Sequence, residues 1–128
     1  MATKVSYRDL PDELKYEPHL KFKFGITDET ADTKHGTLIR VRFEPKVKSQ
    51  PHYHANGDLF FYVISGKSIW YIGKEKKEYV VETGDFMYVP RGEIHSTLNP
   101  SETEPMEGLT GYFGCSNPYK SGKVIVEE

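Results

Sequence analysis

The fold of this chain is decided by residues 84–99, which read GDFMYVPRGEIHSTLN. The run from Phe86 to Val89 is rich in aromatic and branched residues, which favour β-strands. Pro90 and Gly92 follow it, and both residue types are typical of turns. The stretch therefore predicts a strand, a tight turn and a second strand that carries His95.

Outward from this stretch, the chain keeps alternating between short apolar runs and turns rich in glycine, proline or charge. The expected strands are Leu38–Phe43, Asp58–Ile64, Ser68–Ile72, Tyr79–Val81 and Leu109–Phe113. No segment shows a strong helical period, so the pattern indicates an all-β sandwich or jelly-roll barrel. We expect a single domain, with the barrel over residues 37–128 and an arm over residues 1–36 that has a candidate edge strand at Leu20–Phe24.

Two histidines, His52 and His54, stand on either side of Tyr53. Alternate side chains of an extended strand share a face, so both imidazoles point inward if this stretch is a strand. His95 would then complete a set of three nitrogen ligands for a metal ion. The alternative is a surface pair without a ligand, because His-x-His sequences are common and mostly carry no function.

The second segment also fits a family pattern, G-x5-P-x-G-x2-H-x3-N, of the cupin superfamily. The fitting positions are Gly84, Pro90, Gly92, His95 and Asn99. The chain resembles a small single-domain cupin from about Thr37 to Gly114. This resemblance implies a cupin-type double-stranded β-helix, a cup lined by inward-facing alternate residues, with His52, His54 and His95 as metal ligands.

The first cupin motif, G-x5-H-x-H-x3,4-E-x6-G, is matched only in part. Its matching positions are His52, His54 and Gly66. Lys46 stands where the first glycine belongs, and we expect a negative φ at this surface turn. Leu59 takes the position of the glutamate ligand, and Asp58 precedes it. Because strand parity turns Asp58 to the other face, we expect Leu59 to replace the carboxylate ligand unless a bulge brings Asp58 inward.

A site of three neutral imidazoles leaves the charge of a divalent ion uncompensated, so we expect it to prefer a small anionic or enolisable molecule, such as a carboxylate or a 2-hydroxy acid. Among cupins that lack the glutamate are three-histidine dioxygenases acting on thiols and β-diketones. The resemblance therefore favours a metal-dependent dioxygenase, with Fe(II) as the expected ion and Ni, Zn or Mn as alternatives. Substrate would bind first through two oxygens and supply the missing negative charge.

Other functions remain open at this point. The same three histidines suit a Lewis-acid lyase or isomerase, or a non-catalytic cupin that binds a metal or a small molecule. A metal-free cupin that modifies sugars with one histidine as acid and base is disfavoured by three convergent histidines. Glu93, two residues before His95, is a candidate general base or fourth ligand, the alternative being a solvent-exposed turn glutamate.

Composition limits the partners. The chain has 128 residues with 17 Lys and Arg against 19 Asp and Glu, and this balance gives no basic stripe for nucleic acid. No apolar run reaches the length of a membrane span, and the sequence after Met1 has no apolar signal segment. The single cysteine, Cys115, forms no intrachain disulfide and suits a reducing compartment. We expect a cytoplasmic protein without a nucleic-acid or membrane partner.

The expected strand from Asp58 to Ile64 is apolar on both faces. One face carries Leu59, Phe61 and Val63, and the other carries Phe60, Tyr62 and Ile64. A strand of this kind has to be covered on both sides, by a second sheet or by another subunit. We therefore expect a homodimer, and the candidate edge strand of the arm is a candidate for part of the cover, by pairing between subunits.

Overall fold

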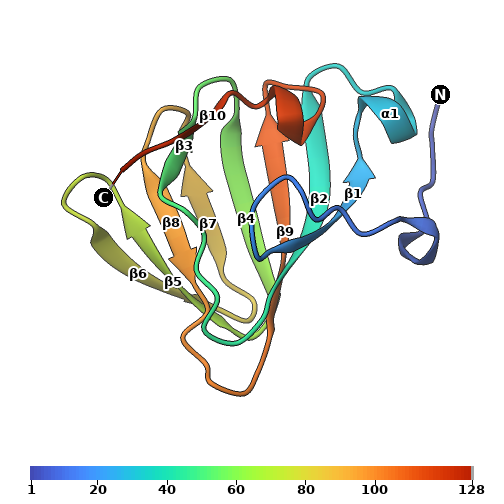
Figure 1. Ribbon diagram of the computed structural model, residues 1–128. Coiled ribbons are helices and arrows are strands. Elements are labelled where there is room, and N and C mark those ends of the chain that lie inside the picture. The colour runs from blue at the N-terminus through green and yellow to red at the C-terminus, as the bar shows by residue number, and fades with distance from the viewer. Residues whose placement is uncertain (128) are drawn as a thin grey trace.

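The computed structural model describes residues 1–127 as two five-stranded antiparallel sheets that face each other (Figure 1). The first sheet holds, in spatial order, β1 (Lys21–Ile26), β2 (Gly36–Phe43), β9 (Met106–Phe113), β4 (Asp58–Ser65) and β7 (Phe86–Val89). The second sheet holds β10 (Lys123–Ile125), β3 (His52–His54), β8 (His95–Leu98), β5 (Lys67–Ile72) and β6 (Lys77–Glu82). The predicted all-β jelly roll is confirmed.

The strands form where apolar residues alternate with polar ones. In β2 the buried side chains are Thr37, Ile39, Val41 and Phe43, and in β4 they are Leu59, Phe61 and Val63. Burying one such apolar side chain stabilises the fold by roughly 1.5–3 kcal/mol. A slip of one residue would turn the whole row to solvent, so burial fixes the register of both strands.

Three short helical pieces lie outside the sheets: the 3₁₀ helices η1 (Tyr7–Asp9) and η2 (Pro118–Lys120), and the helix α1 (Asp28–Ala31). The sequence pattern missed α1 because the helix buries no residue and shows no apolar period. It is defined instead by its start, where the Thr27 side chain accepts hydrogen bonds from the amides of Glu29 and Thr30.

One expected backbone conformation is wrong. Lys46 has a φ of 65°, in the left-handed region, where a negative φ was expected. The turn therefore keeps the conformation that suits the glycine of the family pattern, although lysine occupies the position. A residue with a Cβ atom costs about 1–2 kcal/mol in this region.

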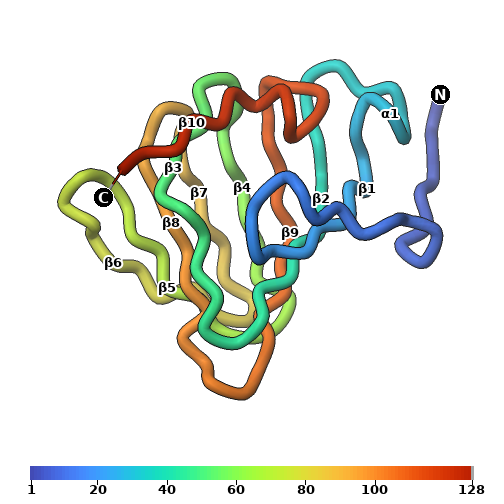
Figure 2. The backbone as a smooth tube through the Cα atoms, in the orientation of Figure 1, coloured from blue at the N-terminus to red at the C-terminus, as the bar shows by residue number. Residues whose placement is uncertain are grey.

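The arm before β1 folds back over the barrel, as Figure 2 shows for its looped blue segment. We call residues 13–20 the strap. At one end Glu13 forms an isolated bridge with Phe22 of the first sheet. Further along, Glu17 forms an ion pair with Lys123 of the second sheet. The strap therefore connects an edge of one sheet to an edge of the other, and β1 pairs with β2 of the same chain.

The outer face of the first sheet carries an aromatic cluster formed by Phe60, Tyr62, Phe86, Tyr88 and Phe113. Phe60 contacts Tyr88 and Phe113, with ring centroids 5.1 and 4.7 Å away. Phe86 is 78% exposed and Tyr88 is 54% exposed, so much of this outer aromatic cluster faces solvent.

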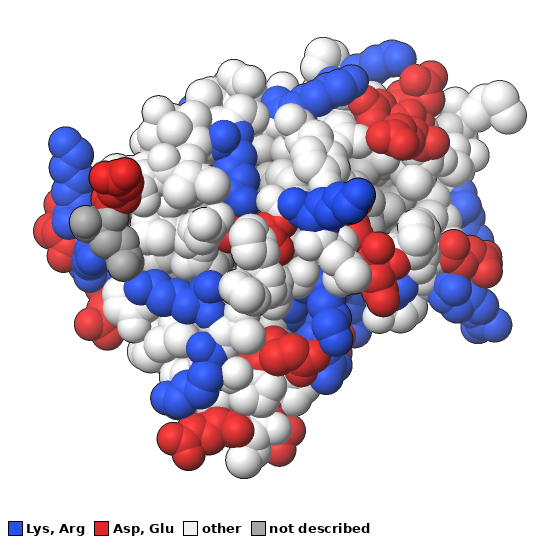
Figure 3. All heavy atoms as spheres, viewed as in Figure 1, with Lys and Arg blue, Asp and Glu red and all other residues white. Residues whose placement is uncertain are grey.

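Charged side chains of both signs are interspersed over the face shown in Figure 3. Among the described residues, no helix has the length and apolar character needed to cross a membrane.

Candidate metal centre

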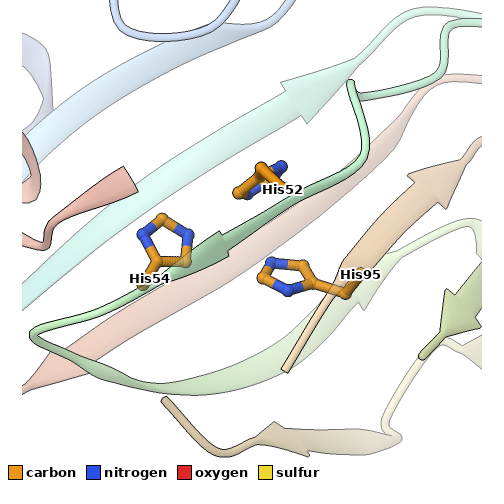
Figure 4. Close-up of side chains that lie close together, drawn as sticks. All are labelled: His52, His54 and His95. Carbon is orange, nitrogen blue, oxygen red and sulfur yellow. The ribbon is translucent and has the colours of Figure 1, made fainter. Parts of the chain in front are cut away.

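The structure brings the three predicted metal ligands together in the interior of the barrel. His52 and His54 project from the same face of β3, and His95 begins β8 directly opposite His52 in the antiparallel pairing. Figure 4 shows the three rings turned toward a common space between these strands. One ligating atom from each ring lies within 4.8 Å of the others, so the three histidines are positioned to bind a metal ion.

Backbone carbonyls orient two of the rings. The Nδ1 atom of His52 contacts the carbonyl oxygen of Gln50, and the Nδ1 atom of His95 lies 3.1 Å from the carbonyl oxygen of Glu93. A carbonyl oxygen can only accept, so each Nδ1 atom carries the proton and donates it. The lone pair of each ring is therefore on Nε2, where a metal can use it.

The ring of His54 is also protonated on Nδ1, and its hydrogen-bond acceptor is a hydroxyl group. The Nδ1 atom of His54 lies 2.8 Å from Ser121 Oγ, which donates its own proton to the carbonyl oxygen of Pro118 at 2.7 Å. Ser121 Oγ therefore accepts from His54. The Nε2 atom of His54 is buried and has no hydrogen-bond partner among the described residues. An unpaired buried acceptor costs about 1–3 kcal/mol, and a bound metal ion would remove this cost.

Burial keeps all three rings neutral. Loss of hydration lowers the pKa of His52 to about 4 and that of His95 to about 3. The pKa of His54 falls to about 2, chiefly through burial and then through its two neighbouring histidines. At neutral pH the rings can accept a metal without first losing a proton, so the donor set fits a divalent transition metal.

Leu59 and Asp58 lie on opposite faces of β4, as the alternation of side chains along a strand predicted. Leu59 is buried and lines the cavity beside the histidines. Asp58 turns away, and its carboxylate accepts a hydrogen bond from the backbone amide of Arg91 at 3.0 Å and pairs with the guanidinium at 3.3 Å. This pairing lowers the pKa of Asp58. No bulge brings the carboxylate inward.

The structure does not bring the side chain of Glu93 to the histidines. Glu93 is exposed, and its contribution to the site is the carbonyl oxygen that holds His95. The turn after Pro90 continues through Gly92 and Glu93, and β8 starts only at His95. The strand alternation that would have placed Glu93 beside His95 therefore does not reach it.

His52 and His95 border a small cavity of about 40 Å³ between the sheets. The wall is more polar than the sequence indicated, since it includes the buried residues Ser49, Thr97, Thr110 and Tyr112. The strap contributes Tyr16, Glu17 and Leu20 to the same wall.

Sequence reasoning missed Glu17, which is only 2% exposed and adds a carboxylate to this cavity. A bound substrate is therefore not the only nearby source of negative charge, as had been expected. Glu17 lies in a weakly patterned segment, and nothing in the local sequence marks it. The one available signal was the segment Leu20–Phe24 after it, which places the preceding residues at an edge of the barrel.

With the geometry established, the comparison with known families decides the classification. The family model described as a cupin domain matches residues 39–112, which is more than half of the chain. The chain belongs to the cupin family. An uncharacterised protein from Aquifex aeolicus is 42% identical over 57 residues, covering 44% of this cupin and 46% of the relative. This cupin thus spans less than half the length of that relative.

Solved structures share the fold at low sequence identity. The polyketide cyclase RemF from Streptomyces resistomycificus superposes with a TM-score of 0.81 at 18% identity, covering 100% of this cupin and 87% of the other chain. The Streptomyces nucleoside dehydratase Pac13 gives a TM-score of 0.75 at 16% identity, covering 99% of this cupin and 92% of the other chain. These likenesses concern the fold.

Proposed function

We propose that this cupin is a metal-dependent enzyme that acts on a small anionic or enolisable molecule, and that its reaction is a dioxygenation. The observation that carries the proposal is the state of the three histidines. All three rings are neutral, buried and oriented through Nδ1, so that their Nε2 lone pairs are free for one ion. A divalent ion held there, with Fe(II) first and Ni, Zn or Mn as alternatives, would supply Lewis-acid chemistry and, for iron, redox chemistry.

The chain's own residues define what can react. Leu59, Phe61 and Trp70 line the cavity and exclude water from one side of it. Ser49 and Thr97 offer hydroxyl groups close to the histidines, and the Ser49 hydroxyl already accepts a hydrogen bond from the Thr97 amide at 2.9 Å. The wall therefore suits a small molecule that carries oxygen atoms.

The proposal is tested by metal analysis of protein purified without an affinity tag, followed by oxygen-consumption assays of the Fe(II)-loaded protein. Acetylacetone and lactate are suitable first substrates because each offers two oxygens to an ion. We expect near-stoichiometric metal that is lost in the His95→Ala variant, and oxygen uptake that requires Fe(II). An absence of metal from the wild-type protein would overturn the proposal.

A second function, Lewis-acid lyase or isomerase chemistry on the same histidines, is favoured by two of the similar structures, a cyclase and a dehydratase. It predicts turnover that is equally fast without oxygen and that persists with Zn²⁺ in place of iron. A third function, binding of a metal or ligand without turnover, predicts bound metal and no reaction under either condition.

The assembly that we propose is a homodimer formed through the outer aromatic cluster. Phe86, Tyr88 and Phe113 are 78%, 54% and 48% exposed on one face, and exposed aromatic patches of this kind mark interaction sites. Light scattering at micromolar concentration tests this proposal. We expect a dimer that Phe86→Lys converts to monomer, whereas Tyr79→Lys, on the other sheet, leaves it intact. A wild-type monomer would refute it.

A further inference from the structure

The strap places a carboxylate where the sequence gave no reason to expect one. Glu17 is 2% exposed and lines the same cavity as His52 and His95. A buried carboxylate is costly unless it is paired and hydrogen-bonded. Both conditions are met here, because Lys123 forms an ion pair with Oε1 and the Gln50 amide donates to Oε2 at 3.1 Å.

These contacts leave Glu17 with spare capacity. An ionised carboxylate has about four acceptor sites, of which the two protein donors occupy two. The remaining lone pairs of this cavity-lining group are available to a molecule inside the cavity. Lys123 offsets the charge of Glu17, so the pair does not repel an anion as an isolated carboxylate would. The carboxylate of this pair is a strong acceptor, so it binds more tightly a ligand that donates a hydrogen bond from an O–H or N–H group.

The backbone of Gln50 ties this acceptor to the histidines. Its amide holds Glu17, and its carbonyl oxygen holds the Nδ1 atom of His52. The same peptide segment thus fixes both groups, and both His52 and Glu17 line the same cavity.

We propose that Glu17 is a specificity-determining residue of this cavity, which selects ligands that carry a hydroxyl group beside the oxygen that binds the metal. The simplest such class is the 2-hydroxy acids. The inference rests on the proposed metal site and narrows its substrate class. The carboxylate and hydroxyl oxygens of the ligand face the histidines, and the hydroxyl proton is donated to Glu17.

The test uses the Zn²⁺-loaded protein, which has no redox chemistry, and measures binding by calorimetry. The probes are glycolate, the smallest 2-hydroxy acid, and acetate, which lacks only the hydroxyl group. The quantity compared is the ratio of the acetate Kd to the glycolate Kd. Because the two probes carry the same carboxylate, a change in this ratio between variants reports an interaction that depends on the hydroxyl group.

We expect Glu17→Gln to lower the ratio by about tenfold, since a hydrogen bond to a charged acceptor becomes one to a neutral acceptor. The single variant leaves Lys123 buried without its partner, so the double variant Glu17→Gln with Lys123→Gln is measured as well and should show the same loss. The matched control is Glu78→Gln on the exposed face of β6, which should leave the ratio unchanged.

The outcomes separate the inference from the proposed function. If Glu17 only closes the barrel, both ligands weaken equally in the variants, the ratio stays constant, and the inference is overturned while the metal site stands. If the wild-type protein takes up neither zinc nor Fe(II), the proposed function fails and the inference fails with it. A ratio that falls in both Glu17 variants and not in the control supports the inference.

Discussion

The histidine wall and the strap border the same cavity, but they are held in different ways. The histidines stand on β3 and β8, whose backbones pair with neighbouring strands, and two of the rings are fixed by backbone carbonyls. The strap has one isolated backbone bridge, at Glu13, and otherwise depends on contacts of side chains such as Glu17 and Tyr16. Because fewer backbone hydrogen bonds hold the strap to the sheets, we expect the strap to open more readily than the wall that holds the ligands.

The largest effect is expected from the histidine wall. Replacing His95 by Ala removes one of three ligands, and metal affinity should fall on the order of a thousandfold, more than the 10–100-fold typical of losing an outer partner. The melting temperature of the metal-free protein should stay near that of the wild type. Competition with a chelating dye measures the affinity, and His35→Ala, at an exposed position, is the control. Equal affinity in the two variants would contradict the assignment.

The second prediction concerns the metal-free protein in acid. Burial lowers the pKa of His52 from 6.5 to about 4, so the unfolded chain takes up this proton at higher pH than the folded protein does. The free energy of unfolding should therefore be unaffected above about pH 6.5 and fall as the pH drops toward 4, by ~3 kcal/mol for this residue. Urea unfolding at several pH values measures the slope. His52→Gln should make it shallower, and an unchanged slope would argue that the ring is hydrated.

A smaller effect is expected from loosening the strap. Lys123→Met removes the ion-pair partner of Glu17, and we expect amide hydrogen exchange in residues 13–20 to accelerate about tenfold or more because local opening becomes easier. Loss of metal to excess chelator should accelerate in parallel, since the strap covers the cavity. Lys67→Met, on the exposed surface of β5, serves as the control. Faster exchange without faster metal loss would show that metal leaves by another route.

The smallest predicted effect concerns the turn at Lys46, which belongs neither to the histidine wall nor to the strap. Replacing this residue by Gly relieves the left-handed backbone conformation and should stabilise the protein by about 0.5–1 kcal/mol after the greater flexibility of unfolded glycine is included. Lys74→Gly is the control, because Lys74 is not among the residues with positive φ and should lose stability. Urea unfolding at neutral pH compares the two variants.

The fold and the ligand set could be predicted because both depend on local pattern. Alternation in β4 gave its register, and parity placed His52 with His54 and separated Leu59 from Asp58. The two alternatives for Glu93 could not be separated from the sequence, because the exact start of β8 depends on the turn that precedes it, and the structure shows the exposed turn glutamate. Strand ends are the least certain part of any such pattern.

Glu17 could not be predicted because its role depends on contacts that no local pattern encodes. Its partner Lys123 lies in β10, a strand of three residues without a buried side chain that was not anticipated. A short edge strand of this kind has too few alternating positions to stand out from a loop. The presence of the Glu17 carboxylate at the cavity therefore follows only from the three-dimensional contact between the strap and β10.

The ion pair between Glu17 and Lys123 spans 106 positions along the chain. Closing so long a loop costs conformational entropy, and the ion pair stabilises the chain only after the loop has closed. We therefore expect this contact to form late in folding. The histidine wall depends on strand pairing and can assemble earlier. We therefore expect a period during refolding in which the metal ligands are in place before the strap has docked. Metal added during refolding should be taken up faster than metal added to the folded protein, because the closing strap traps what has already entered.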